Sequence, residues 1–386
     1  MLARTKGNCY RMTVGVVKET QPEERRVALV PAAMKPLAQA GMDVLVETTA
    51  GVQSFHDDGA YKECGARIVD RKTAASADIV VRVAPPTDAE IGQLRVSGVL
   101  IGFLGPLDDP GICARLAAQG VTALSMELVP RISRAQKMDA LSAMASLSGY
   151  KAVLLAAAAL PRFYPLLTTA AGTVRPATVL VLGAGVAGLQ AIATARRLGA
   201  RVHGYDIRDS VQEEVQSLGA QFVELDLEIG DMQDAGGYAQ ALIAEKARRQ
   251  TELLTPHIGQ ADVVIATAQI PGREAPTLVT REAAEAMRPG SIIVDVAAPT
   301  GGNCVLTAPG ETVVHRGVQI LGPRNLPATM PVHASQLYAR TVRSMIEEFA
   351  ADGQFCANFD DEIFRGACVT HAGQVVHDRI KSLLAA

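Results

Sequence analysis

Residues 177–190, ATVLVLGAGVAGLQ, begin as an apolar run, break at three glycines and continue with a helical pattern. A strand, a glycine turn and a helix start in this order can hold the pyrophosphate of a dinucleotide. Gly183 would make the tight turn, Gly185 would let the backbone approach phosphate, and Gly188 would let the helix pack on the strand. The N–H groups at the start of the following helix would then face the anion.

A second apolar run, residues 201–205, ends in Asp206, eighteen residues after Gly188. A carboxylate near this position commonly accepts hydrogen bonds from the adenosine ribose. The alternative is an ordinary strand–helix turn followed by a surface aspartate. Asp206 favours NAD over NADP because it would repel a 2′-phosphate, and Arg208 weakens that preference without reversing it.

Composition excludes several classes of protein. The 386 residues are 48% apolar and 20% charged, with a net charge of −3, so nothing indicates a nucleic-acid partner. The six cysteines form no C-x-x-C pair, and we expect neither a metal site nor a disulfide framework. The longest uninterrupted apolar stretch, 152–160, is short of the roughly 20 residues of a membrane span. We therefore expect no direct membrane insertion.

Strand and helix patterns alternate along the chain, which predicts an α/β protein with parallel, doubly wound sheets. In the first series we expect strands at 13–17, 44–48, 79–83, 99–104 and 122–128, and helices at 31–41, 88–95 and 112–120. In the second series we expect strands at 177–182, 201–205, 220–225, 261–267, 291–297 and 318–322, and helices at 186–198, 210–218, 238–258 and 281–287. The glycine fingerprint belongs to the second series alone.

Two long helical patterns, 137–159 and 332–351, would link the two series. The tail at 355–380 contains the hairpin-like VTHAGQVVH and has too little core to fold alone. We predict two Rossmann-like domains with a cleft between them, the default place for a ligand. The first would comprise 1–140 with 335–386, and the second, which carries the fingerprint, would comprise 141–334.

The segment 226–238 is long and acidic, and it ends in Gly236, Gly237 and Tyr238. Long loops over a cofactor site often act as lids. A solvated connection would have the same composition, and the pattern does not decide between the two.

Two segments at strand ends could carry chemistry. The first is 18–28, with Lys18, Glu19, Arg25 and Arg26. The second is 127–142, in which Gln136, Asp139 and Ser142 are spaced by three residues and would lie broadly on one helix face. A capped, salt-bridged helix start fits the second segment too, and spacing alone favours it.

The chain resembles the alanine dehydrogenase and nicotinamide nucleotide transhydrogenase superfamily. KE…RRVALVP and LGAGVAGLQAIATARRLGA carry the general likeness. MELVPRISRAQKMDALSAMASLSGYKAV, TTAAGTV, DAGGYA, and TAQIPG followed by SIIVDVA are similar to the NAD(H)-binding domain of proton-translocating transhydrogenases. The likeness extends from Thr13 to about His377, and RISRAQ and GGYA are more specific than the glycine fingerprint.

The resemblance implies a role for each matching residue. RISRAQ would contact the nicotinamide end of NAD(H), with Gln136 orienting the ring, and Arg131 and Asp139 would complete the catalytic set. Tyr238, beside Gly237, would close a mobile loop over the nucleotide. The remaining implied cofactor contacts are Ser133, Arg134 and Ser142 at the nicotinamide end, Gly183, Gly185, Val186 and Gly188 at the pyrophosphate, and Asp206, Ile207 and Arg208 at the adenosine ribose.

Departures from alanine dehydrogenase are informative. That enzyme needs a Lys, a His and an Asp, and the matching places here hold Ala84, Gly105 and Pro299. None of these three can transfer a proton. Arg26, which would hold a substrate carboxylate, is retained as a relic or as a structural ion pair. The resemblance therefore implies that amino-acid oxidation is lost and NAD binding is kept.

The implied activity is hydride transfer from NADH to NADP⁺ held by a partner, which needs orientation and water exclusion rather than an acid or base. By resemblance, the partners are membrane-spanning and NADP(H)-binding subunits, and the chain is a homodimer. It would be cytoplasmic, peripheral on the inner face of the membrane through those partners. The alternatives are an alanine dehydrogenase-like oxidoreductase and a non-catalytic NAD-binding module.

Overall fold

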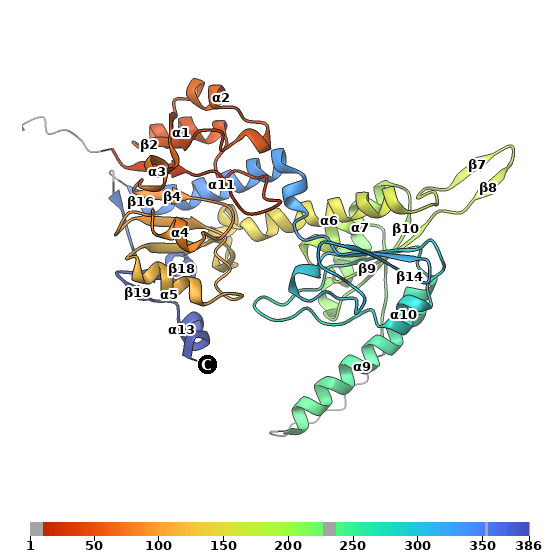
Figure 1. Ribbon diagram of the computed structural model, residues 1–386. Helices are drawn as coiled ribbons and strands as arrows, with labels where there is room; N and C mark the ends of the chain where they lie inside the picture. The colour runs from red at the N-terminus through yellow and green to blue at the C-terminus, as the bar shows by residue number, and fades with distance from the viewer. Residues whose placement is uncertain (1–10, 227–236, 352–353, 386) are drawn as a thin grey trace, which may run out of the picture. The chain divides into compact units, whose positions relative to one another are not determined.

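A computed structural model describes residues 11–226, 237–351 and 354–385 of the chain (Figure 1). They form two compact units. Unit 1 comprises Met1–Met144 and Pro327–Ala386, and unit 2 comprises Ala145–Leu326. Each unit is built around a largely parallel sheet, as the alternating pattern predicts.

The unit 1 sheet has the order β3-β2-β1-β4-β5-β6, with β18 and β19 added beside β6. Its first six strands are parallel, and β18 and β19 are antiparallel additions from the tail of the chain. The strands are β1 Thr13–Val16, β2 Asp43–Glu47, β3 Arg67–Val69, β4 Ile79–Val81, β5 Val99–Gly102, β6 Thr122–Ser125, β18 Cys368–His371 and β19 Gln374–Val375. The order in which the strands are added reverses between β1 and β4, and ligands bind at such a switch point in open α/β sheets.

Helices complete unit 1, and the longest of them, α11, buries a stripe of residues that includes Tyr338, Val342 and Met345. The unit 1 helices are α1 Met34–Gln39, α2 Asp58–Glu63, α3 Arg71–Ala75, α4 Asp88–Ile91, α5 Gly111–Ala118, α11 Pro331–Phe349, α12 Glu362–Ala367 and α13 Asp378–Ala385. Short 3₁₀ helices η1 Pro31–Ala33, η2 Val52–Ser54, η3 Met126–Leu128, η4 Ser133–Met138 and η7 Pro327–Thr329 and the small pair β16 Ala350–Ala351 and β17 Gln354–Phe355 lie between them.

The unit 2 sheet repeats the same layout, in the order β11-β10-β9-β12-β13-β15-β14. Its switch point lies between β9 and β12, and β9 ends at the glycine fingerprint. The strands are β9 Thr178–Leu182, β10 Arg201–Tyr205, β11 Gln221–Phe222, β12 Val263–Ala266, β13 Ile292–Asp295, β14 Thr312–His315 and β15 Val318–Leu321. A separate hairpin, β7 Leu167–Thr169 and β8 Gly172–Val174, extends from the body of this unit (Figure 1).

Both faces of the unit 2 sheet are covered, which explains why its strands are nearly continuous apolar runs. On one face, Val179 and Val181 pack with Ile192 of α7 and Ala152 of α6. On the other face, Leu180 and Leu182 pack with Leu254 and Ile258 of α9. The helices are α6 Ala140–Ala159, α7 Val186–Arg197, α8 Gln212–Ser217, α9 Gly237–Gln260 and α10 Arg281–Glu285, with 3₁₀ helices η5 Asp209–Val211 and η6 Ala298–Thr300.

Several elements were not expected from the sequence, among them β3, β14, the β7–β8 hairpin and the short helices α2, α3, α12 and α13. One helix start is also corrected. We expected a helix from 137, but α6 begins at Ala140 after the 3₁₀ helix η4. Gln136 therefore lies in η4, Asp139 lies between the helices and Ser142 lies in α6, so these three residues do not share the face of one α-helix.

Helix α6 is long and apolar enough to cross a membrane by length and composition, the one such helix among the described residues. Core helices of soluble proteins pass the same test. Three of its residues, Ala152, Val153 and Ala156, are completely buried against the unit 2 sheet. This packing accounts for the apolar residues in that part of the helix.

Candidate dinucleotide-binding site

The glycine turn at the end of β9 has the geometry that the sequence predicts. Gly183 has a φ of +94°, a left-handed conformation that side chains disfavour. A Cβ at Gly188 would lie 1.8 Å from the carbonyl oxygen of Gly183, so only glycine lets α7 start this close to the turn. A Cβ at Gly185, in contrast, would meet no heavy atom within 4 Å. The absence of a side chain at Gly185 thus leaves open space above the turn.

Helix α7 begins at this open space. Gly185 is its N-cap and provides no side-chain hydrogen bond to the first turn. The first N–H groups of a helix have no partner within the helix, and together with the helix dipole they attract anions. Val186 is 41% exposed at the same place. The turn and the helix start therefore fit a pyrophosphate.

Asp206 lies at the end of β10, the strand beside β9. Its side chain accepts a hydrogen bond from the Ala184 N–H at 2.8 Å and a two-pronged contact from Arg208 at 2.9 and 3.0 Å. Burial raises the pKa of Asp206, but these hydrogen bonds outweigh it, so the pKa lies below its ordinary value. Asp206 is therefore an anion, and Arg208 is its side-chain partner. Ile207, beside them, is 70% exposed.

Two residues that the sequence did not single out, Thr267 and Asn303, fix the end of β12 beside the turn. The hydroxyl of Thr267 donates to the carbonyl oxygen of Gly183 at 2.9 Å. The buried side chain of Asn303 accepts from the Ala268 N–H at 3.0 Å and donates to the Ala268 carbonyl at 2.9 Å. A sequence signal was available for Thr267, because it begins TAQIPG, which follows the strand across the switch point.

The 131–142 segment belongs to unit 1. Some of its side chains form hydrogen bonds or ion pairs with other residues of the protein. Arg134 pairs with Glu348 at 3.1 Å and Asp361 at 2.6 Å, which ties the segment to the tail of the chain. Asp139 accepts from the backbone N–H of Ser142 at 2.8 Å and from its hydroxyl at 2.6 Å. This is the capped helix start that spacing alone favoured.

Three other side chains in this segment are exposed and make no hydrogen bond or ion pair within the part of the chain that the structure describes. They are Arg131, Ser133 and Gln136. They lie on or just before η4, whose Ala135 and Met138 are buried. The buried pair fixes η4, and the unpaired side chains are left free to contact a ligand.

The first segment that could carry chemistry, residues 18–28, follows β1. Its buried carboxylates form hydrogen bonds and ion pairs within the protein. Glu19 is buried and accepts from the N–H groups of Val83 at 2.5 Å and Ala84 at 3.2 Å, and it lies 3.5 Å from Arg82. Burial raises the pKa of Glu19 to about 7, although Arg82 and the Val83 N–H lower it. Glu19 thus spans the switch point of unit 1, from the end of β1 to the end of β4.

A second carboxylate, that of Glu127, binds the backbone N–H groups that follow β5. Glu127 accepts from the N–H groups of Leu104 at 2.9 Å and Gly105 at 2.5 Å. Burial raises its pKa. Ala84 and Gly105, two of the places that hold proton-transfer groups in alanine dehydrogenase by resemblance, therefore offer only backbone, and internal carboxylates bind that backbone.

Arg26 is engaged as well. Its guanidinium donates to Glu24 at 2.8 and 2.6 Å, and both side chains are buried. The sequence left open whether Arg26 is a relic of a substrate site or part of a structural ion pair. The structure supports the ion pair. A guanidinium that donates two hydrogen bonds to an internal carboxylate has few donors left for the carboxylate of a substrate.

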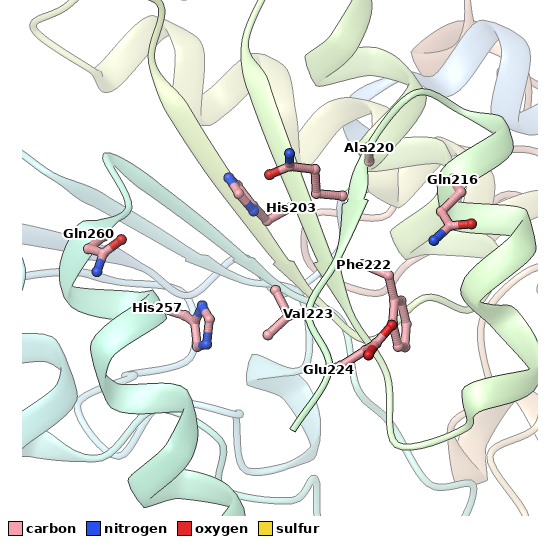
Figure 2. Close-up of a pocket in the computed structure, with 9 residues that line it drawn as sticks. His203, Gln216, Ala220, Phe222, Val223, Glu224, His257 and Gln260 are labelled. Carbon is pink, nitrogen blue, oxygen red and sulfur yellow. The ribbon is translucent and has the colours of Figure 1, made fainter. Parts of the chain in front are cut away.

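The predicted lid falls largely outside the described residues, which omit 227–236. Gly237 is the first residue of α9, and the side chain of Tyr238 is likewise outside the description. A cavity of about 630 Å³ lies between β10, β11 with the loop that follows it, and the end of α9. Figure 2 shows the side chains that line it. His203 and His257 line it and the glycines of the turn do not. Desolvation, Arg201 and His257 lower the pKa of His203.

Comparisons with known proteins now decide the family. The model of the alanine dehydrogenase/PNT N-terminal domain matches residues 15–148, and that of the C-terminal domain matches residues 152–378. The chain belongs to the alanine dehydrogenase/PNT family. Its fold agrees with that of a transhydrogenase from Sinorhizobium meliloti, with a TM-score of 0.83, 39% identity, and coverage of 95% of this chain and 99% of that one.

Within the family, transhydrogenases are closer to this chain than alanine dehydrogenases. A Rhodospirillum rubrum polypeptide, named as the first part of NAD(P) transhydrogenase subunit alpha, is 41% identical over 95% of this chain and 98% of its own length. A solved L-alanine dehydrogenase has a TM-score of 0.81 at 26% identity, with coverage of 97% and 99%. The fold is shared across the family, and the sequence separates its two branches.

Proposed function

We propose that this chain is the NAD(H)-binding subunit of a proton-translocating NAD(P) transhydrogenase. It would pass hydride between NADH bound here and NADP⁺ bound on a partner subunit, and membrane subunits would couple this transfer to proton movement. One contrast carries the proposal. Unit 2 keeps an open glycine turn, while Ala84, Gly105 and Pro299 supply no proton-transferring side chain. Hydride transfer between two nicotinamides needs no such group at the reacting carbons.

The proposal assigns each part of NAD(H) to residues that suit it. The fit is best at the pyrophosphate, where Gly185 leaves open space at the start of α7. When bound, NADH supplies the hydride, and the chain's own residues bind and orient it. The assigned contacts are Gly183, Gly185, Val186 and Gly188 at the pyrophosphate, Asp206, Ile207 and Arg208 at the ribose, Arg131, Ser133 and Gln136 at the nicotinamide end, Arg134, Asp139 and Ser142 as supports of that segment, and Gly237 and Tyr238 in the closing loop.

The partners follow from the same proposal. The relatives from Haemophilus influenzae and Rhodospirillum rubrum are named as subunit alpha of NAD(P) transhydrogenase or as its first part, which supports an assembly with other subunits. The partners of this chain would bind NADP(H) and span the membrane. This chain would then be cytoplasmic and peripheral on the inner face of the membrane, without inserting into it.

A homodimer is the assembly we propose for the chain itself. The β7–β8 hairpin is exposed along nearly its whole length, with Leu166 61% exposed and Val174 44% exposed. A two-stranded hairpin is marginally stable alone in water, so a second copy of the chain would stabilise it. Sedimentation equilibrium should give twice the chain mass, and a monomer at micromolar concentration would contradict this assembly.

Two alternatives remain to be separated by experiment. An alanine dehydrogenase-like enzyme would reduce NAD⁺ when L-alanine is added, and a non-catalytic module would bind NADH without turnover. Purified chain should be mixed with NADH, an NADP⁺ analogue and an NADP(H)-binding partner domain. We expect hydride transfer in this mixture and no reduced nicotinamide with L-alanine and NAD⁺. Alanine-dependent turnover, or binding without transfer, would select one of the alternatives.

Gln136 and Tyr238 have different proposed tasks, which rapid-mixing kinetics can distinguish. Gln136→Asn should slow hydride transfer on the order of 10²-fold with saturating nucleotide, because misplacing reacting carbons by about 1 Å costs that much. Tyr238→Phe should change nucleotide affinity and release more than the transfer step. Gln93→Asn, at an exposed unit 1 position outside the proposed site, is the matched control. Wild-type transfer by Gln136→Asn would remove the nicotinamide from this segment.

A further inference from the structure

Four arginines surround one cavity of unit 2 at the edge of the sheet where the parallel strands begin. The cavity is about 550 Å³ and is lined by Arg162, Arg175, Arg201, Arg288, Thr178 and Asp262. Thr178 and Arg201 are the first residues of β9 and β10 and lie side by side in the strand register. The glycine turn follows the other end of β9, about 13 Å away at roughly 3.3 Å per residue. The cavity is therefore separate from the dinucleotide turn.

A single carboxylate holds two of the four guanidiniums in place. Asp262 is buried and pairs with Arg162 and, at 2.8 Å, with Arg288. Its other oxygen accepts from the Thr178 N–H at 2.9 Å, so the carboxylate has its own full set of partners. Arg162 also donates to the Pro289 carbonyl at 3.2 Å. These two arginines are fixed before any ligand arrives.

The other two guanidiniums lie exposed at the cavity. Arg175 and Arg201 are exposed and form no ion pair or hydrogen bond through their side chains with any residue in the described ranges. Four positive charges thus face one carboxylate that is already shared. Like charges that converge on one cavity repel each other, and a multivalent anion would relieve that repulsion.

We propose that this cavity is an anion site for a phosphate-bearing small molecule with at least two phosphate groups. The cavity volume lies within the range of about 300–1,000 Å³ that is usual for small-molecule sites. Planar guanidinium groups bind the oxygens of carboxylate and phosphate two at a time, and a compound with two or more phosphate groups brings more negative charge and more oxygens to four arginines than an isolated carboxylate does. Neither the proposed hydride transfer nor NADH binding requires this site.

Calorimetric titration with inorganic tripolyphosphate at low ionic strength tests the proposal on the full chain. We expect saturable binding that weakens as salt is added. The double variant Arg175→Gln/Arg201→Gln should raise the Kd at least tenfold, because it removes the two unpaired guanidiniums. Arg281→Gln, an exposed arginine at the start of α10, should leave the Kd unchanged. Both positions of the double variant are exposed, so its thermal unfolding should match that of the wild type.

Two further titrations identify the ligand class and the site. Citrate should bind at least tenfold more weakly than tripolyphosphate. The NADH affinity should be the same in the wild type and the double variant, and NADH should not displace tripolyphosphate. No saturable binding, an unchanged Kd in the double variant, equal affinity for citrate, or displacement by NADH would each overturn the assignment.

Discussion

The two sheets of this chain share one strand order, but they differ in which groups bind the backbone N–H groups at their switch points. In unit 1, Glu19 and Glu127 bind the backbone N–H groups that follow β4 and β5. In unit 2, the start of α7 has a glycine N-cap, which has no side chain to bind its N–H groups. Unit 1 supplies its own anions at these positions, whereas in unit 2 Asp206 binds only the Ala184 N–H and the N–H groups at the start of α7 stay open to an external anion.

This difference explains how one layout serves two purposes. A parallel sheet concentrates free N–H groups near the ends of its strands, and buried donors need partners. Internal carboxylates satisfy them permanently in unit 1, so that edge becomes structural. A ligand phosphate can satisfy them reversibly in unit 2. Binding capacity therefore depends on a few residues at strand ends and is independent of the strand order.

The largest effect should come from closing the open turn at Gly188. Gly188→Ala would place a Cβ 1.8 Å from the Gly183 carbonyl oxygen, so α7 would have to shift. We expect a destabilisation of unit 2 of about 3 kcal/mol or more and loss of NADH binding. Urea unfolding and calorimetric titration with NADH measure the two effects.

Gly185→Ala is the matched control for this variant, because its Cβ would meet no protein atom within 4 Å. Stability should stay within about 0.5 kcal/mol of the wild type, while the NADH affinity should fall at least tenfold. If Gly185→Ala binds NADH normally, the open space does not hold the pyrophosphate, and the contrast between the two sheets fails.

The next effect concerns the internal carboxylate Glu19. Its pKa in the folded protein is raised from 4.5 to about 7, so the folded state holds an extra proton between these values and stability falls as pH rises through this window. Glu19→Gln removes this loss. When the pH rises from 4.5 to 8, the free energy of unfolding of the variant should increase by about 3 kcal/mol relative to that of the wild type. Urea unfolding at both pH values, with hydrogen exchange of residues 79–90 to follow unit 1, measures this gain.

Glu90→Gln tests the sign of that effect. Burial raises the pKa of Glu90, but the Thr87 N–H and Arg82 outweigh it, so its folded pKa is lowered. Its stabilising contribution is present above its ordinary pKa and is lost as pH falls, so Glu90→Gln should be more damaging at pH 8 than at pH 4. The same slope in both variants would show that Glu19 is an ordinary ion pair.

The smallest effect should come from Asp206. Asp206→Ala should weaken NADH by about 1.5–3 kcal/mol, the value of a hydrogen bond to a charged group. The same change releases Arg208, which could then accept a 2′-phosphate, so the NADPH affinity should rise. Titration of both nucleotides decides the matter. Equal affinities for NADH and NADPH in the wild type would show that Asp206 does not read the ribose.

The turn in unit 2 could be predicted because each glycine leaves a sequence signal. Gly183 and Gly188 are required by backbone geometry at fixed spacing, and the structure has the positive φ and the close approach that the spacing implies. Asp206 was found in the same way, from its distance to the glycines and its position at a strand end. Local rules of this kind operate within about 25 residues.

The carboxylates of unit 1 could not be predicted by such rules. Glu19 stands in a charged segment, and nothing in KETQPEERR separates the buried carboxylates from the exposed one. The ion pairs of Arg134 with Glu348 and Asp361 join residues more than 200 positions apart, so no local rule anticipates them. The hairpin at 167–174 was missed because TTAAGTV has the composition of a loop. In each case tertiary contacts decide the outcome.

The insertion of unit 2 into unit 1 has a consequence for synthesis of the chain on the ribosome. Strand β6 ends at Ser125, but its neighbour β18 begins only at Cys368. At a translation rate of about 5–20 residues per second, β18 is synthesised on the order of 10–50 s after β6, and this edge of β6 is unpaired until then. Unit 2 is complete at Leu326 and can fold first. During this interval an unpaired strand edge is open to other nascent chains, so chaperone capture should concentrate before β18 emerges.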